Sequence, residues 1–501
     1  MSAKRGVTPL DSSAVDHWDG EADVVVVGYG VAGAAAALGA AAEGADVLVL
    51  ERASGWGGAA ALSGGFVYMG GGTPLQQACG FEDTADAMFD FLMAAMGPGA
   101  DEARIRLYSN ESVDHYHWLL SHGVHYNPVF HPDPAHEPPP GRSLMYSGGE
   151  NAWPFSTVAP AAPRGHVANR PPNRPVAEDD QAEQGGGYWL MLALTDSCAQ
   201  AGVGAQYDVR TDRLVVEDGR VVGVAGVEGG RPVHYRARRG VVLAGGGFMH
   251  NDSMMRRFAP ELAGKPGGVV DGNDGSCIRM AQSLGADLGR MDGCEVWSLA
   301  IAPELVAKGI LVDMHGQRFV TEDTYPGRVS QFICYRADDK AWLVVDDDIY
   351  EGTELGPISR RLRRVRPVAV AETATELEEA VGLPSGSLES TIALYNRHAA
   401  EGRDPVFHKS TEFVKPLRPP YGILDVGGRS VGFTLGGLRT SLDGEVLHVS
   451  GDAIPGLYAA GRAASGVPVW GYASGTSLGD GSFFGRRAGR HAAAAARTTR
   501  S

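Results

Sequence analysis

The sequence predicts an α/β fold in which a second segment is inserted into a Rossmann-like, dinucleotide-binding domain. The first observation is the run of residues 24–33, where consecutive valines lead into a glycine-rich turn. The second is Glu51, which ends the next apolar run about twenty residues later. The third is the run 456–461, where apolar residues flanked by glycines return near the other end of the chain. Together they predict one discontinuous domain whose two parts are separated by the insert.

Each glycine of the first turn has a role in the dinucleotide fingerprint. Gly28 permits the tight turn, Gly30 lets the backbone approach a pyrophosphate, and Gly33 allows close packing of the helix. Glu51 supplies the acid that binds a ribose hydroxyl. The alternative is that the uncharged residues 24–42 span a membrane, because they meet the usual length threshold. Glycine and alanine dominate this run, so a strand and a helix joined by a glycine turn explain it better.

Composition and charge argue against several classes of protein. The 501 residues, 44% hydrophobic and 21% charged, suffice for two or more domains with a large core. The net charge of -16 argues against a nucleic-acid or anionic-membrane partner, because either needs a clustered basic surface. The five cysteines contain no C-x-x-C pair, which fits neither a zinc site, an iron–sulfur cluster nor a redox dithiol. We expect them to be buried as small apolar residues.

The N-terminus has neither the apolar stretch of a signal peptide nor a twin-arginine signal. Export is therefore not expected. The prediction is a cytoplasmic protein without stable membrane insertion.

Two segments are expected to line a ligand. Residues 57–65 are too rich in glycine for a core element, and their backbone amides could line a cofactor. Residues 128–175 carry twelve prolines, which bias the chain away from helix and predict a long coil. A coil of this length is typically a lid or a binding wall, with a surface excursion as the alternative. Its histidines His131, His136 and His166 are expected on the solvated surface.

The middle of the chain is predicted to continue the cofactor domain. A helical pattern covers residues 185–202, and residues 205–227 alternate as a hairpin of strands. The apolar strand 240–244 runs into the glycine-rich residues 245–251, which we interpret as a second cofactor turn. A helix is expected from about 274 to 285.

The glycine content falls between Cys294 and Val414, which marks a candidate substrate domain. Residues 1–293 and 415–501 are thus predicted to form the discontinuous cofactor-binding domain, and residues 294–414 the catalytic or substrate domain. The last helix is expected to be capped by Asp480, so that its positive N-terminal end favours an anionic cofactor.

The order of these motifs resembles the superfamily of FAD-dependent oxidoreductases that contains the fumarate reductases and the 3-ketosteroid dehydrogenases. Beyond the N-terminal fingerprint, the motifs that carry the resemblance are the loop 57–65, Ala244-Gly-Gly-Gly-Phe248, the pair Asn273-Asp274, His315-Gly-Gln-Arg-Phe319 with Glu322, and Gly456-Leu-Tyr-Ala-Ala-Gly461. The resemblance covers nearly the whole chain. It implies a glutathione-reductase-type FAD-binding domain with an inserted α+β capping domain.

The resemblance also implies which residues hold FAD. They are Gly28, Gly30, Val31, Ala32, Gly33, Glu51, Arg52, Gly57, Gly58, Ala59, Ser63, Gly64, Gly65, Ala244, Gly245, Gly246, Asn273, Asp274, Gly461, Arg462, Ser477 and Leu478. Residues 57–65 include no histidine, so FAD is expected to be held without a covalent bond. A metal is not expected.

The sequence departs from the carboxylate reductases of this superfamily at the substrate site. Those enzymes bind their substrate with arginines, whereas Tyr325 stands three residues after Glu322 here. The C-terminal turn, residues 470–481, carries no Asn-Arg pair before its Leu-Gly. A carboxylate substrate is therefore disfavoured, with Arg328 as the residue that could substitute for the missing clamp.

Tyr325, Tyr472 and Ser474 instead resemble the active site of the 3-ketosteroid dehydrogenases, most closely the Δ4-(5α) type that desaturates C4–C5. The resemblance implies that Tyr472 donates a hydrogen bond to the C3 oxygen of the steroid, that Ser474 takes the C4 proton and that Tyr325 accepts or relays it. The Δ1 type is the alternative, and Ser474 favours Δ4. Without the resemblance, Tyr325 is equally well an interfacial tyrosine, and the other two belong to a glycine-rich turn.

Three functions therefore stay open. The first is a flavin dehydrogenase that oxidises a steroid and passes electrons to an unidentified acceptor. The second is a reductase of an activated double bond, as in the fumarate reductases. The third is a flavin-binding electron carrier without catalysis, against which the large insert argues.

Overall fold

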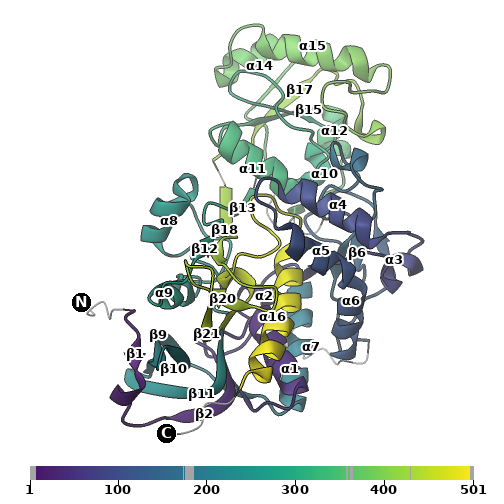
Figure 1. Cartoon of the computed structure of the whole chain (residues 1–501). Coiled ribbons are helices and arrows are strands. Elements are labelled where there is room, and N and C mark those ends of the chain that lie inside the picture. Colours follow the sequence, from purple (N-terminus) through teal and green to yellow (C-terminus); the bar gives the residue numbers. More distant parts are fainter. Residues whose placement is uncertain are drawn as a thin grey trace.

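The largest sheet provides the frame of the molecule (Figure 1). The computed structural model describes residues 7–172, 174, 185–298, 300–356, 359–360, 365–428 and 430–496. Within these residues the sheet has nine strands, in the order β1-β9-β10-β11-β2-β3-β8, with β21 paired to β11 and β20 to β21. The strands are β1 (Leu10–Asp11), β2 (Gly20–Val27), β3 (Val47–Leu50), β8 (Gly204–Gln206), β9 (Val209–Glu217), β10 (Arg220–Glu228), β11 (Arg231–Leu243), β20 (Glu445–Leu447) and β21 (Ala453–Ala459).

The valine run of β2 is apolar throughout because both faces of the strand are covered. β2 pairs in parallel with β3 and with β11, and β11 pairs in parallel with β21. Val25 and Val27 belong to the apolar cluster on one face, and Val24 and Val26 to the cluster on the other. Parallel strands buried on both faces have such continuous apolar sequences. The predicted Rossmann-like fold and the return of the chain at β21 are confirmed.

The turn after β2 requires its glycines. Gly28 has a φ of 102°, a conformation that side chains other than glycine rarely adopt. Gly33 lies in the first turn of α1 (Val31–Ala42), where a Cβ would collide with the carbonyl group of Gly28. The membrane span considered for residues 24–42 is wrong, because these residues form a strand, a turn and a helix.

The alanine-rich helix α1 packs along α16 (Thr476–Ala494), so an early and a late segment of the chain lie side by side (Figure 1). Small side chains allow this approach, and a Cβ on Gly489 of α16 would collide with the backbone of Ala36. Across the described parts of the chain, no helix combines the length and the apolar character that crossing a bilayer requires.

The proline-rich segment contains short elements rather than one continuous coil. Together with β4 (Phe66–Tyr68), its strands β5 (Phe130–His131), β6 (Leu144–Met145) and β7 (Gly165–Val167) form a sheet in the order β4-β7-β6-β5. The helices beside it are α3 (Pro74–Ala78), α4 (Ala85–Met96), α5 (Glu102–Asn110) and α6 (Ser112–Ser121). Residues 173 and 175 of the predicted coil lie outside the described residues.

The exposure predicted for the histidines of this segment is wrong. His131 and His166 are buried and His136 is half-buried. The ring of His166 lies 2.8 Å from the Thr73 hydroxyl and 3.0 Å from the Arg164 carbonyl oxygen, so its polar atoms are paired inside the protein. Burial lowers the pKa of His166 to about 4, and the ring is therefore neutral.

The insert has its own antiparallel sheet, at the far end of the molecule from the main sheet (Figure 1). Its order is β14 (Ile310–Val312), β15 (Trp342–Asp346), β17 (Tyr421–Asp425) and β16 (Ala369–Ala371). Its helices are α10 (Pro303–Val306), α11 (Pro326–Arg336), α12 (Asp347–Gly352), α14 (Ala374–Val381) and α15 (Ser387–Ala399). One apolar cluster runs from Ala300 to Val426. The division into two domains stays a prediction, and β17 joins this sheet although it follows the predicted end at 414.

Two strand pairs lie where the chain enters and leaves the insert. β13 (Cys294–Ser298) pairs with β18 (Ser430–Thr434), and β12 (Leu288–Gly289) pairs with β19 (Gly437–Leu438). The other helices are α2 (Gly58–Ala61), α7 (Gly186–Gln200), α8 (Asp252–Phe258) and α9 (Ser276–Gln282), with the 3-10 turns η1 (Ser12–Ala14), η2 (Phe155–Thr157), η3 (Pro260–Leu262), η4 (Thr411–Phe413) and η5 (Gly461–Ala463). All five cysteines are free and four are buried, as expected.

The capping role predicted for Asp480 is wrong. Helix α16 begins at Thr476, so Asp480 lies inside the helix. Its Oδ1 accepts a hydrogen bond of 2.8 Å from the backbone of Val467, which ties the preceding loop to the helix.

Candidate active site

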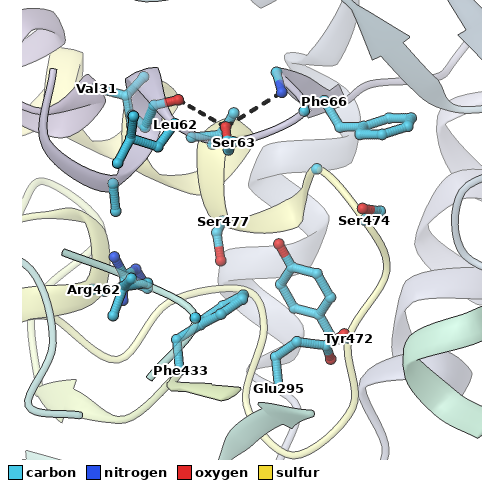
Figure 2. A pocket seen from close by; sticks show the side chains of 18 of the residues that line it. Val31, Leu62, Ser63, Phe66, Glu295, Phe433, Arg462, Tyr472, Ser474 and Ser477 are labelled. Carbon is cyan, nitrogen blue, oxygen red and sulfur yellow. Dashed lines mark hydrogen bonds between the residues drawn. The ribbon is translucent and has the colours of Figure 1, made fainter. Parts of the chain in front are cut away.

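A cavity of about 720 Å³ extends from the glycine turn after β2 to strand β13. The main sheet contributes the turn at residues 28–32, and the insert contributes residues 323–327. Residues 132–137 of the proline-rich segment form part of the wall, which confirms that this segment is a binding wall. Figure 2 shows Val31, Leu62 and Ser63 on one side of the cavity, and Phe433, Tyr472 and Glu295 on the other. The cavity therefore joins the cofactor turn to the predicted catalytic residues.

At the β2 end the geometry suits an adenine dinucleotide. Glu51 follows β3, and its carboxylate accepts hydrogen bonds from the backbone of Tyr29 at 2.6 Å and of Ala53 at 2.9 Å. These contacts hold the acid beside the glycine turn, where a ribose would lie. The helix α1 starts immediately after the turn, and its unpaired N–H groups favour a pyrophosphate.

All but three of the predicted FAD-binding residues line the cavity. The three are Gly33, which packs α1 against the turn, Gly57, which precedes α2 with a φ of 109°, and Asp274, which pairs with Arg52 at 2.9 Å. These three residues do not line the cavity themselves, but they contact or adjoin residues that do. The assignment of individual residues to FAD stays a prediction.

Beside Phe433, the cavity offers a guanidinium group that its protein surroundings leave partly unpaired. Arg462 lies over the Phe433 ring, 5.2 Å from its centroid, and its Nη1 is buried without a hydrogen-bond partner in the described structure. Burial lowers the pKa of Arg462 to about 10, so the group still carries its charge at neutral pH. A buried cation aimed into a cavity fits an electron-rich ligand such as the flavin ring. The glycine turn with Glu51 and the partly unpaired guanidinium group of Arg462 thus both fit FAD.

The predicted catalytic residues meet on one wall of the cavity, although Tyr325 is distant from the other two in sequence. Tyr325 stands immediately before α11, and Tyr472 and Ser474 stand in the loop before α16. The rings of Tyr325 and Tyr472 are 6.2 Å apart between centroids. Ser147 fixes the loop, because it accepts from the backbone of Ser474 at 2.8 Å and donates to its carbonyl oxygen at 2.9 Å.

These hydroxyl groups are held neutral. Burial raises the pKa of Tyr472 and raises the pKa of Tyr325 well above its ordinary value. The Ser474 hydroxyl group opposes the rise in the pKa of Tyr325. A neutral phenol is a good hydrogen-bond donor and a poor base, so proton removal at this wall needs a further acceptor.

The structure supplies an acid that the sequence prediction missed. Glu295 lies on β13, lines the cavity and is 2% exposed. Its Oε1 accepts a hydrogen bond of 2.8 Å from the Tyr325 hydroxyl. Burial raises the pKa of Glu295 to about 8. The sequence did contain a signal for this residue, namely a glutamate inside the strand pattern Cys-Glu-Val-Trp-Ser. A buried strand accommodates a carboxylate only at a cost in free energy, so such a residue indicates a specific role.

Arg328, the residue considered as a carboxylate clamp, has other contacts. Its guanidinium group donates to the carbonyl oxygens of Gly148 at 3.0 Å and of Tyr472 at 3.4 Å, and lies over the Phe155 ring. It is absent from the cavity wall. Arg328 therefore supports the loop that carries Tyr472 and does not present its charge to a substrate.

A buried ion cluster supports the loop that carries Tyr325. Arg318 pairs with Glu322 at 2.6 Å and with Asp404 at 2.8 Å, and Lys409 pairs with Glu322 at 3.2 Å. All four side chains are at most 6% exposed. This cluster contains the Arg318 and Glu322 of the predicted motif, and its role is to anchor the chain just before the cavity.

The chain was compared with known proteins. The family model for the FAD binding domain matches residues 23–478. A 3-ketosteroid Δ4-(5α)-dehydrogenase of Rhodococcus jostii, solved in complex with 4-androstene-3,17-dione, is 54% identical with a TM-score of 0.93, over 97% of this chain and 100% of that chain.

Two curated relatives are more distant. The 3-oxosteroid 1-dehydrogenase of Mycobacterium tuberculosis is 30% identical, over 94% of this chain and 98% of the relative. The 3-oxo-5-alpha-steroid 4-dehydrogenase of Comamonas testosteroni is 28% identical, over 90% and 95%. This chain therefore belongs to the FAD-dependent oxidoreductases with this FAD-binding domain, the superfamily of the fumarate reductases and the 3-ketosteroid dehydrogenases, and its cofactor is FAD.

Proposed function

We propose that this protein dehydrogenates 3-keto-5α-steroids and introduces the C4–C5 double bond. The observation that carries the proposal is the meeting of Tyr325, Tyr472 and Ser474 on the cavity wall opposite the glycine turn. It is supported by the similar Rhodococcus jostii enzyme, whose bound 4-androstene-3,17-dione is a 3-ketosteroid with a double bond at C4.

Each polar residue of this wall can carry out one step of the reaction. Tyr472 donates a hydrogen bond to the C3 oxygen, where a preorganised donor is worth roughly 10²- to 10³-fold in rate. Ser474 receives the proton from C4, and Tyr325 accepts the hydroxyl proton of Ser474. Bound FAD would supply the acceptor for the hydride that leaves C5. The apolar side chains of Phe66, Trp297 and Phe433 suit a flat, rigid substrate and exclude water from these transfers.

The regiochemistry distinguishes this proposal from its nearest alternative. A Δ1 dehydrogenase removes hydrogens from C1 and C2, and a curated relative with this activity is 30% identical. The serine at position 474 favours C4, because it adds a second hydroxyl group beside Tyr325. A carboxylate reductase is disfavoured, because Arg328 is bound to carbonyl oxygens outside the cavity wall.

The cofactor linkage and the electron acceptor belong to the same proposal. We expect FAD to be released intact by acid precipitation, because the glycine-rich loop 57–65 offers no histidine for a covalent bond. The electron acceptor is not identified by any feature of the described surface. A cytoplasmic location stays a prediction.

The experiment is an anaerobic mixture of the purified yellow protein with a saturated 3-keto-5α-steroid. The expected result is loss of the oxidised flavin absorbance and a product whose NMR spectrum shows a C4–C5 double bond. A C1–C2 product would reassign the protein to the Δ1 type. An unbleached flavin, together with reoxidation of the reduced protein by fumarate, would replace the proposal with a reductase.

A further inference from the structure

We propose that Glu295 is the terminal proton acceptor of this site, which receives through Tyr325 the proton that leaves C4 and holds Tyr325 in position for that transfer. The inference deepens the proposed function and rests on it. Because Glu295 acts through Tyr325, it is a positioning residue rather than a catalytic one.

The geometry around the carboxylate is specific. Glu295 lies in the middle of the pairing between β13 and β18, opposite Phe433, so its backbone position is fixed by the sheet. Its Oε1 receives the Tyr325 hydroxyl at 2.8 Å. The first turn of α11 packs against it so closely that a Cβ on Gly327 would collide with Oε1. The phenol and the carboxylate therefore keep one arrangement.

The second carboxylate oxygen of Glu295, Oε2, has no protein partner among the described residues and is available to a ligand in the cavity. Within the described structure Oε2 of Glu295 is buried without a hydrogen-bond partner, and the residue lines the cavity. A buried polar atom without a partner destabilises the fold, so its retention here points to a ligand or a proton as its partner. Figure 2 places Glu295 beside Tyr472, on the same wall as Ser474.

The proton transfers balance as follows. The C4–H bond breaks and its electron pair enters the developing enolate, while the proton moves to the Ser474 oxygen. The Ser474 hydroxyl proton moves to the Tyr325 oxygen, and the Tyr325 hydroxyl proton moves to Glu295. Serine and tyrosine end neutral and Glu295 ends as a neutral acid. Without the carboxylate, Tyr325 could accept the Ser474 proton only if it began as a buried tyrosinate, a state that burial strongly disfavours.

The charged and titratable groups that face Glu295 set the pH at which it works. Tyr325, Arg328 and Tyr335 face it from the α11 side, Cys294 precedes it on β13, and Tyr472 faces it from the loop before α16. Burial raises its pKa to about 8, against the opposing effects of the Tyr325 hydrogen bond and the Arg328 charge. Since only the carboxylate can accept a proton, the rate of flavin reduction should rise with pH through about 8.

The test is the rate of anaerobic flavin reduction in Glu295→Gln between pH 6 and 10. Glutamine keeps an oxygen for the Tyr325 hydrogen bond and cannot take up the proton. We expect the rate at pH 9 to fall about 10²-fold, the rise near pH 8 to disappear, and KM for the steroid to change less than about threefold. Glu295→Asp should restore part of the rate and keep a pH-dependent limb.

Glu379→Gln is the matched control, because it makes the same chemical change on an exposed face of α14 and Glu379 does not line the cavity. It should keep the rate and pH profile of the wild type. If Glu295→Gln also keeps them, the inference is wrong while the proposed function stands. If the wild-type flavin is not bleached by any 3-keto-5α-steroid, the proposed function fails and the inference falls with it. A melting curve of each variant separates loss of folding from loss of proton transfer.

Discussion

Two glutamates of this chain are both fully buried, yet their surroundings are opposite. Glu322 contacts Arg318 and Lys409, and those two charges outweigh burial so that the pKa of Glu322 is lowered. Glu295 receives the hydrogen bond of one phenol, and no ion pair joins it within the described residues. Burial therefore dominates and raises its pKa to about 8. A compensated buried charge anchors a loop, whereas an uncompensated one is available for chemistry.

The largest effect should come from breaking the compensated cluster. Glu322→Gln leaves Arg318 and Lys409 buried without their shared carboxylate, and such losses cost about 3–5 kcal/mol of stability. Chemical denaturation of the FAD-loaded protein measures the change. Glu379→Gln, on the exposed face of α14, is the control and should stay within about 0.5 kcal/mol. Equal stabilities for Glu322→Gln and the wild type would show that the cluster does not hold the fold.

The second-largest effect should be on the rate of flavin reduction and not on stability. Tyr472→Phe removes the proposed donor to the C3 oxygen while keeping the ring packed against Phe433. We expect flavin reduction by the steroid to slow by roughly 10²- to 10³-fold, with little change in unfolding. Rapid-mixing absorbance measurements give the rate. A variant that reacts at the wild-type rate would remove Tyr472 from the mechanism and leave the oxygen to another donor.

The smallest effect is a difference in the pH dependence of stability. The folded-state pKa of Glu295 is raised above its ordinary value of 4.5, so its contribution to stability is present below that value and is lost as pH rises toward about 8. Glu295→Gln avoids this loss. The melting temperature of the variant minus that of the wild type should therefore increase by about 5 °C from pH 5 to pH 8. Glu322 acts oppositely, since its lowered pKa makes stability fall as the pH becomes acidic. Parallel melting curves for Glu295→Gln and the wild type across this range would contradict the comparison.

The local sequence was sufficient to predict the structure wherever that structure depends on a short stretch of backbone. The turn at Gly28 depends on a positive φ and on small residues that pack within a few positions, so its place and its dinucleotide role were predictable. The same holds for helix α7 and for the hairpin of β9 and β10, which follow residues 185–202 and 205–227 closely. Tyr325, Tyr472 and Ser474 were predicted through the motifs around them, and all three line the cavity.

Other features depended on segments that are distant along the chain. The start of α16 at Thr476 was missed because Asp480 resembles a cap, whereas it binds the backbone of Val467. The buried state of His166 depends on Thr73, which packs against it from another part of the chain. No local pattern contains such a partner.

What the sequence by itself determined was the cofactor fold and the chemical groups available at its edge. Only the tertiary structure decided which buried acid lines the cavity. The pairing of β13 with β18 brings Glu295 against Tyr325, while Arg318 and Lys409, from two distant segments, neutralise Glu322. The physical reason is that the ionisation of a buried carboxylate depends on the charges within a few ångströms of it, and those charges come from distant parts of the chain.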